Sequence, residues 1–404
     1  MGFLVENSCF SLRLSLTALR YTGFWSTESL RGGKLLLYNC YGFLCFMFLL
    51  GIFIITEVID LYLVWGNLPL MTGTAFLLFT NLAQATKIIN IVLRRKAILK
   101  VIAYCDKALK ADQSIEGRII VESCNRETRS QQLFFYILTV FTCAGWAGSA
   151  EKNKLPLRAW YPYDTSNHPE YEITYVQQVS AILFAALLNV SKDTLVTTLI
   201  AQCRCSLRLV GLSLRNIHCE RNFIAESNPD RVSLVQPSTT LFFTRAQETE
   251  VQKRLKNCAI QHQNTLETAL LLQNTFSEPI FAQFNVSLVI ICATAFQLVS
   301  QTGNFVRLMS MGTYLLNMIY QVFIYCYQGN QFSSESEEVA RAAYDMPWYS
   351  CSVRTRRSIL IAMVRCRRVA KLTAGGFTTL SLTTFMAIIK TSYSLFTLLQ
   401  QFTK

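Results

Sequence analysis

Few of the 404 residues have types and spacings that could do chemistry. Cys203 and Cys205 could be imagined as half of a metal site, but zinc sites need a second pair at suitable spacing, and the sequence has none. The three histidines, His168, His218 and His262, fit no HExxH pattern, and there is no P-loop or G-x-S-x-G motif. The sequence therefore predicts no enzyme, no cofactor and no bound metal.

A second set of polar residues lies in the last apolar stretch of the chain. At three- and four-residue steps it contains Thr383, Ala387, Lys390, Ser394, Thr397 and Gln401. On a helix these positions form one small or polar stripe, which suits a wet pore or a helix–helix contact through hydroxyls. Because a bare ammonium near mid-bilayer is costly and would repel cations, we expect Lys390 to face a carboxylate or carbonyls, with Asp193 and Glu278 as possible partners.

The elements that position these residues are predicted to be membrane-spanning helices. Hydrophobic residues make up 51% of the chain and charged residues only 16%, where soluble proteins carry about 25%. The apolar residues gather in blocks of about twenty, the length of helix that crosses a bilayer core. Seven such blocks are expected as helices, at residues 35–55, 68–93, 133–149, 176–200, 280–299, 308–327 and 377–399.

The distribution of basic residues predicts which way the chain faces. Most of the 38 lysines and arginines fall in segments 1–34, 94–131, 203–276 and 330–374, which are therefore expected in the cytoplasm. This places the N-terminus in the cytoplasm and the C-terminus outside, the reverse of a G-protein-coupled receptor. The net charge of +13 is then explained by topology and anionic lipid headgroups, without nucleic acid.

The segments between the blocks differ in length, and segment 203–276 is too long to be a structureless loop. We expect a cytoplasmic N-terminal segment at 1–34, helices one to four at 35–202 with an outer loop at 150–176, and helices five and six at 277–329. Segment 203–276 is expected to extend helices four and five into the cytoplasm. Segment 330–374, which contains a basic helix, would complete a subunit interface, although that helix could instead lie on lipid.

Four short stretches are distinctive in their order and in their positions relative to these helices. They read LPLRAWYPYD at 155–164, YCYQGN at 325–330 followed by Glu335 and Ser336, AAYDMPW at 342–348, and KTSYSLFTLL at 390–399. In these stretches the chain resembles the insect odorant receptors, a family of ligand-gated cation channels. Leu395 departs from the family pattern, where an aromatic residue is common, and we expect this to alter packing rather than activity.

The resemblance implies an odorant-specific subunit of a non-selective cation channel that opens on a volatile apolar odorant or pheromone. It implies a heterotetramer with the odorant receptor co-receptor, Orco, in the plasma membrane of an olfactory neuron dendrite, in contact with lipids and permeating cations. The seventh helix, within 375–404, would line the pore. The implied pore and gate residues are Lys390, Ser394, Thr397, Leu398, Gln400 and Gln401.

The resemblance also implies an apolar odorant cavity in the outer half of the subunit, walled by helices two, three, four and six. Matching positions are Phe76, Phe79, Thr139, Thr142, Trp146, Leu183, Leu187, Thr313, Tyr314 and Asn317. Trp146 and Tyr314 fit best, because aromatic side chains with a polar group suit ligand cavities. Each residue could instead serve ordinary core packing or lipid contact.

Two other classes remain as alternatives. A gustatory receptor shares the inverted topology but typically has a different motif in its seventh helix. A G-protein-coupled receptor, or a small transporter, would place the N-terminus differently.

Overall fold

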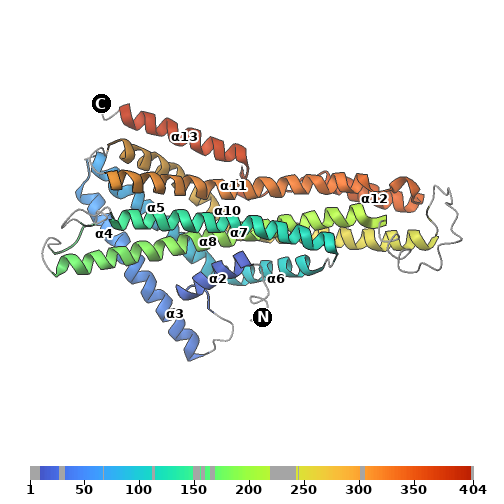
Figure 1. Cartoon of the computed structure of the whole chain (residues 1–404), viewed down its shortest axis with the longest axis horizontal. Helices are drawn as coiled ribbons and strands as arrows, with labels where there is room; N and C mark the ends of the chain where they lie inside the picture. The colour runs from blue at the N-terminus through green and yellow to red at the C-terminus, as the bar shows by residue number, and fades with distance from the viewer. Residues whose placement is uncertain are drawn as a thin grey trace.

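The computed structural model is a bundle of long helices that lie side by side (Figure 1). It describes residues 10–26, 32–66, 68–111, 114–148, 155, 160–163, 169–218, 243, 245–300 and 305–401. Parts of the expected N-terminal segment, of the outer loop 150–176 and its LPLRAWYPYD motif, of segment 203–276 and of the C-terminal end lie outside these residues, as does the side chain of Phe76.

The first part of the chain folds into shorter helices along the bundle (Figure 1). These are α2 (Phe10–Tyr21), α3 (Gly33–Cys45), a π-helical turn (Phe46–Gly51), α4 (Ile52–Leu63), α5 (Leu68–Leu93) and α6 (Arg95–Ala111). The first expected span corresponds to α3, the π-helical turn and α4 in sequence. Glu57 and Asp60, which were expected to follow that span, lie within α4 and are buried.

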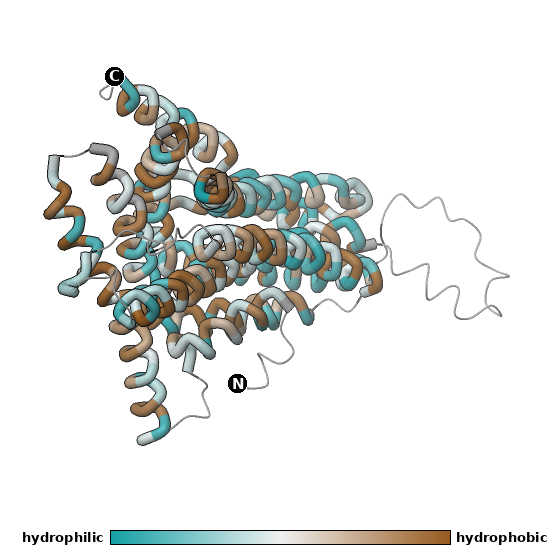
Figure 2. Tube along the Cα trace, turned by 60° about the vertical axis from the view of Figure 1, so that its left-hand side comes forward, coloured by the Kyte–Doolittle hydropathy of each residue, from teal (hydrophilic) through white to brown (hydrophobic). Residues whose placement is uncertain are grey.

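Four long helices form the body of the bundle: α7 (Ile115–Gly148), α8 (Glu170–Arg215), α10 (Arg245–Ser300) and α11 (Phe305–Asp345). The 46 residues of α8 measure about 69 Å at the usual helical rise, about twice the thickness of a bilayer core. Hydrophobic residues concentrate at one end of the bundle and polar residues at the other (Figure 2). We call the polar end the helical extension: residues 95–131, 203–218, 243, 245–276 and 330–372.

The chain leaves the extension through α12 (Val353–Cys366) and then a short antiparallel hairpin of β1 (Thr373–Ala374) and β2 (Thr378–Thr379). Gly375 and Gly376 sit in the turn with φ of 63° and 84°, a left-handed conformation that glycine adopts without strain. The sequence Ala374-Gly375-Gly376 predicts a helix break before the last span, and the turn between β1 and β2 confirms it. Because the hairpin occupies the next residues, α13 (Leu382–Gln401) begins five residues later than expected.

Five of the described helices are long and apolar enough to cross a membrane: Gly33–Leu63, Gly73–Leu93, Glu170–Arg215, Arg245–Val299 and Leu382–Gln401. The third and sixth expected spans lie in α7 and α11, which are long but less apolar. α11 carries Asn317 and Gln321 within its apolar block, and both side chains are buried in hydrogen bonds to other helices. Polar residues with partners inside the subunit thus lower the hydropathy of α11 without facing lipid.

Candidate functional site

A cavity of about 100 Å³ lies between the helices at the apolar end of the bundle. Its walls come from the π-helical turn, α4, α5, α7, α8 and α11. The lining residues are Leu49, Leu50, Phe53, Leu77, Thr80, Asn81, Gln84, Thr139, Thr142, Cys143, Trp146, Ala181, Ile182, Ala185, Ala186, Asn189, Tyr314, Asn317 and Met318. The lining is mostly apolar with a few polar groups, which is the usual make-up of a small-molecule site.

Half of the expected site residues do line this cavity. They are Thr139, Thr142, Trp146, Tyr314 and Asn317, and all five come from α7 and α11. Trp146 is 6% exposed and packs in one apolar cluster with Phe53 and Met318. The structure therefore brings the α7 and α11 positions together as expected.

The expected residues on α8 are not part of the cavity wall. Leu183 is 55% exposed and Leu187 is 38% exposed, so both face outward, where lipid would cover them. The wall is formed instead by neighbouring small residues, among them Ala181 and Ala185. Small side chains leave space between helices, whereas large apolar ones favour the lipid face, so the sequence pattern gave α8 the wrong rotation.

The same error affects α5 and one position of α11. Phe79 is 36% exposed, and the α5 wall is made by its neighbours Leu77, Thr80, Asn81 and Gln84. Thr313 does not line the cavity, and its hydroxyl donates to the carbonyl of Ser310 in its own helix at 3.0 Å. The sequence signal that could have identified the α5 wall is the polar set Thr80, Asn81 and Gln84, which recurs at helical spacing within an apolar block.

The polar groups of the cavity wall are largely paired with one another. The hydroxyls of Thr80 and Tyr314 lie 2.7 Å apart, and Thr139 donates to Oδ1 of Asn317 at 3.3 Å. These bonds connect α5 to α11 and α7 to α11 across the cavity. A ligand that enters must either fit beside these pairs or exchange bonds with them.

Two buried carboxylates of α4, which the sequence did not single out, lie behind this wall. Asn81 donates through Nδ2 to both carboxylate oxygens of Glu57, at 3.1 and 3.0 Å. Glu57 is fully buried, and one turn later Asp60 accepts a hydrogen bond of 2.6 Å from Thr74. These contacts fix α4 against α5 and hold the Asn81 amide in the cavity wall.

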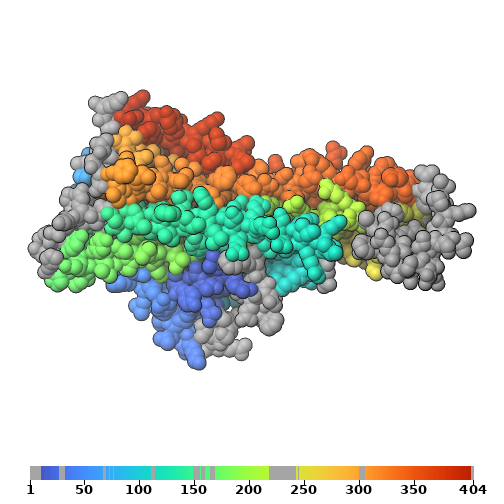
Figure 3. Space-filling view, viewed as in Figure 1, coloured from blue at the N-terminus to red at the C-terminus, as the bar shows by residue number. Residues whose placement is uncertain are grey.

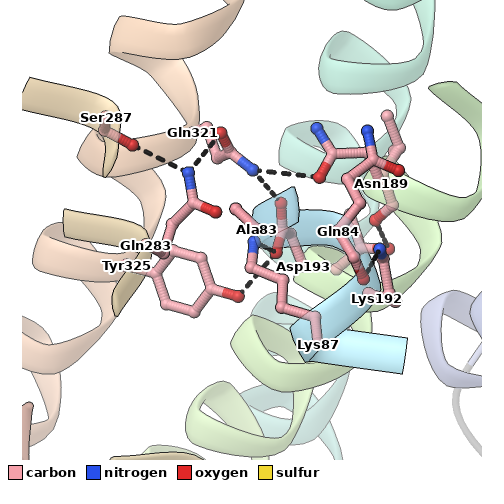
Figure 4. Close-up of polar contacts among 12 residues, drawn as sticks. Ala83, Gln84, Lys87, Asn189, Lys192, Asp193, Gln283, Ser287, Gln321 and Tyr325 are labelled. Atoms are coloured by element: carbon pink, nitrogen blue, oxygen red, sulfur yellow. Dashed lines mark hydrogen bonds and ion pairs between the residues drawn. The ribbon is translucent and has the colours of Figure 1, made fainter. Parts of the chain in front are cut away.

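Next to the cavity, buried charged and amide side chains meet at the centre of the bundle (Figure 4). We call this group the Asp193 cluster; it contains Lys87, Lys192, Asp193, Gln283, Ser287, Gln321 and Tyr325. Lys87 Nζ lies 2.6 Å from Asp193 Oδ1, and Tyr325 donates to the same oxygen at 2.8 Å. Gln321 donates to the other carboxylate oxygen.

The Asp193 cluster contacts the cavity wall and continues to α10. Gln321 donates to Oδ1 of Asn189 at 3.2 Å, and Lys192 donates to the backbone carbonyl of Gln84 at 3.2 Å. Both Asn189 and Gln84 line the cavity. On the other side, Gln283 of α10 donates to Oε1 of Gln321 at 3.1 Å, so the cluster joins α5, α8, α10 and α11.

The two partners proposed for Lys390 are engaged elsewhere, which corrects that expectation. Asp193 pairs with Lys87, and Glu278 pairs with Arg94 at 2.9 Å. Lys390 instead lies on the exposed face of α13. Which charged residues pair depends on the distances between helices, and these distances cannot be read from the sequence.

α13 lies on the surface of the bundle, against α10 and α11 (Figure 3). Its inner face includes Ser392, which donates to the carbonyl of Leu288 in α10 at 3.2 Å. The polar stripe faces away: Thr383, Ala387, Lys390, Ser394 and Gln401 are exposed, while Thr397 is half-buried. Of the other expected gate residues, Leu398 is exposed and Gln400 is half-buried.

In the part of the chain that the structure describes, no three His, Cys, Asp or Glu side chains come together as a metal site would require. The arrangement offers a ligand cavity and a buried polar cluster. It offers no assembled nucleophile and base in the cavity wall.

Comparisons with known proteins agree with this geometry. A family model described as 7tm Odorant receptor matches residues 67–393. Odorant receptor Or1 of Anopheles gambiae is 24% identical over 416 residues, which cover 96% of this chain and 95% of that protein. Odorant receptor 83a of Drosophila melanogaster is 26% identical over 293 residues, 66% of this chain and 64% of that protein.

The fold is shared with a solved receptor. The insect olfactory receptor OR5 from Machilis hrabei, in complex with eugenol, matches with a TM-score of 0.78 and 17% identity. The match covers 96% of this chain and 97% of that chain. A second structure of the same receptor matches with a TM-score of 0.75 and 18% identity.

Proposed function

Because the chain belongs to the 7tm Odorant receptor family, and is therefore an insect odorant receptor and not an enzyme, we propose that it is a subunit of an odorant-gated, non-selective cation channel. The observation that carries this proposal is the position of the cavity. It lies among helices that are linked through the Asp193 cluster to α10, on which α13 packs.

The proposed ligand is a small volatile molecule with an apolar body and at most a few polar atoms. A cavity of about 100 Å³ is close in size to an engineered apolar cavity of about 150 Å³ that binds benzene. Shape and dispersion contacts with Trp146 and Phe53 would supply most of the binding. The olfactory receptor OR5 from Machilis hrabei, which shares this fold, was solved in complex with eugenol, an aromatic molecule with few polar atoms.

The proposed pore is lined by α13. A polar face that meets lipid is unfavourable, so the exposed stripe of α13 favours contact with water or another subunit. If four subunits place this face around one axis, Lys390, Ser394 and Gln401 line the conduit, and Thr397, Leu398 and Gln400 shape its gate. The remaining subunits would include the co-receptor Orco, with the helical extension as the interface.

The Asp193 cluster is the proposed connection between ligand and pore. A ligand beside Asn189 or Gln84 displaces residues that bond directly to Gln321 and Lys192. Gln321 bonds to Gln283 on α10, and α10 in turn accepts the hydrogen bond from Ser392 of α13. Since every member is buried between helices, a shift at the cavity changes packing at α10 and thereby the position of α13.

The orientation that we propose places the N-terminus and the helical extension in the cytoplasm and the C-terminus outside. The bundle would sit in the plasma membrane of a sensory dendrite, with the cavity in its outer half. The basic residues of the extension support this orientation. The match to an odorant receptor model supports it over the gustatory and G-protein-coupled alternatives.

The test is a pair of alanine variants of the subunit, co-expressed with the co-receptor and recorded across an odorant panel. Trp146→Ala removes a buried cavity wall, so we expect the half-maximal odorant concentration to shift at least tenfold, which is about 1.4 kcal/mol. Leu183→Ala changes a lipid-facing side chain on α8 and should leave the dose–response unchanged.

Surface labelling of both variants provides the control for folding. Normal surface levels with a shift only in Trp146→Ala support the proposed cavity. An equal shift in both variants would place the ligand elsewhere. Odorant responses carried by a second messenger, with no current in excised patches, would refute the channel.

A further inference from the structure

The two cysteines that flank Arg204 on α8 each meet a cysteine from another helix. Cys203 Sγ lies 3.8 Å from Sγ of Cys105 on α6. Cys205 and Cys124 of α7 line the same small cavity, and the Cys205 thiol influences the pKa of Cys124. All four thiols are buried. Residues two apart on a helix point about 200° apart, so the pairs lie on opposite sides of α8 and cannot bind one metal together.

The charges around the two pairs differ. Nη2 of Arg204 lies 3.9 Å from Cys124 Sγ, and its guanidinium is held in place by Glu127 at 3.1 and 2.7 Å. The hydrogen bond from Cys205 and the positive charges of Arg204 and Arg208 lower the pKa of Cys124 to about 6, against the opposing effect of burial. A lowered pKa favours the thiolate form of Cys124, which is the form that reacts with oxidants.

The second pair, Cys105 and Cys203, serves as an internal comparison, because Cys203 lies on the same helix as Cys205. The hydrogen bond with Cys203, together with burial, raises the pKa of Cys105 well above its ordinary value. Asp106 is a nearby negative charge that adds to this rise. The two pairs therefore differ in their charged neighbours: Asp106 acts on Cys105, whereas the Arg204 guanidinium lies 3.9 Å from the Cys124 sulfur.

A small cavity of about 10 Å³ borders Cys124 and Cys205. Thr198 and Gln202 also line it, and the Thr198 hydroxyl and Gln202 Oε1 are buried without a hydrogen-bond partner among the described residues. A space of about 10–15 Å³ with polar partners is enough for one water molecule. The site thus offers a polar niche of about one water molecule beside the Cys124 sulfur, with two polar atoms that a hydroperoxide oxygen reaching the sulfur would meet.

We propose that Cys124 and Cys205 form a peroxide-sensitive dithiol, whose oxidation closes a disulfide between α7 and α8. In the first step the Cys124 thiolate attacks one peroxide oxygen, the O–O bond breaks, and the departing hydroxide takes a proton to become water. Cys124 is then a sulfenic acid. In the second step the Cys205 sulfur attacks the Cys124 sulfur, and the hydroxyl leaves with the thiol proton as a second water.

The disulfide would connect two helices that also form the ligand cavity. α7 supplies Trp146 to its wall and α8 supplies Asn189. A covalent link at the far ends of these helices restricts their relative movement. An effect of this disulfide on the odorant response rests on the proposed function, whereas formation of the disulfide itself does not.

The experiment uses the purified full-length receptor, treated with hydrogen peroxide, alkylated, digested and mapped by mass spectrometry. We expect a linked peptide pair containing Cys124 and Cys205, reversed by dithiothreitol, that forms at least tenfold faster than a Cys105–Cys203 link. The absence of that pair, or equal rates for both pairs, would overturn the proposal. The wild-type chain is the sample, so no variant needs to fold.

Two variants separate the chemical steps. With Cys205→Ser, the Cys124 sulfenic acid should accumulate and be trapped by dimedone, with no linked peptide. Cys258→Ser removes a buried thiol whose pKa burial raises to about 11, and should leave the Cys124–Cys205 link unchanged. Failure of dimedone to label Cys124 in Cys205→Ser would also contradict the mechanism, whatever the receptor's odorant currents.

Discussion

Two regions of this receptor place polar residues within apolar helices, and they treat them in opposite ways. In the Asp193 cluster the polar side chains are buried and bonded to one another across four helices. On α13 a stripe of polar side chains points away from the bundle. Because unpaired polar groups are unfavourable in hydrocarbon, the first set stabilises the bundle, and the second favours contact with water or with another polar surface.

This comparison also explains why polar content alone does not identify a pore helix. α11 and α13 both carry amides and hydroxyls in their apolar blocks. The difference is the direction in which they point, which depends on the neighbouring helices. The predictions below test each side of the comparison in turn.

The largest effect is expected at the ion pair of the cluster. Asp193→Asn leaves Lys87 and Lys192 buried without their carboxylate, and breaking a buried pair typically costs about 3–5 kcal/mol. We expect at least a tenfold loss of receptor at the cell surface, measured by surface biotinylation. Adding Lys87→Gln removes one uncompensated charge and should restore part of the surface level.

Gln321→Leu is the matched control for that variant, because it removes a hydrogen-bond donor and leaves the ion pair intact. Its expected cost is about 1–3 kcal/mol, so its surface level should fall less. A surface level for Asp193→Asn equal to that of Gln321→Leu would mean that the charge of Asp193 does not stabilise the bundle.

An intermediate effect is expected on the exposed side of the comparison, at Lys390. If the stripe lines the pore, removing a positive charge from it should increase cation conductance about threefold, the size of change that about 0.65 kcal/mol produces. The measurement is single-channel current of Lys390→Gln. Thr391→Val, next to it on α13, is the control and should leave conductance unchanged; no difference between the two variants would place Lys390 outside the pore.

The smallest effect is expected at the outer end of α13. Thr397→Ala and Gln400→Ala remove polar groups without changing charge, so they should alter ion selectivity and basal current and leave surface expression unchanged. Reversal potentials in sodium and potassium solutions measure the selectivity. Unchanged selectivity and basal current in both variants would show that the gate lies elsewhere.

Sequence reasoning named four helices that do wall the cavity, α5, α7, α8 and α11, but on α5 and α8 it selected residues that do not line it. On α7, Thr139, Thr142 and Trp146 recur at helical spacing, and a tryptophan with a polar group suits a protein-facing position. On α8, the choice of Leu183 over Ala185 assumed that large apolar residues face the ligand. In a membrane they also face lipid, so hydrophobicity does not distinguish the two faces of such a helix.

The sequence by itself determined the helical blocks, their continuation into a polar extension, the break at Gly375 and Gly376, and the polar stripe of α13. These features are local, since they depend on residues within one helix or one turn. The tertiary structure alone decided that Asp193 pairs with Lys87, that alanines on α8 leave room for a cavity, and that Cys205 meets Cys124. Such contacts depend on the rotation of each helix against neighbours far away in the chain, which packing of the whole bundle sets.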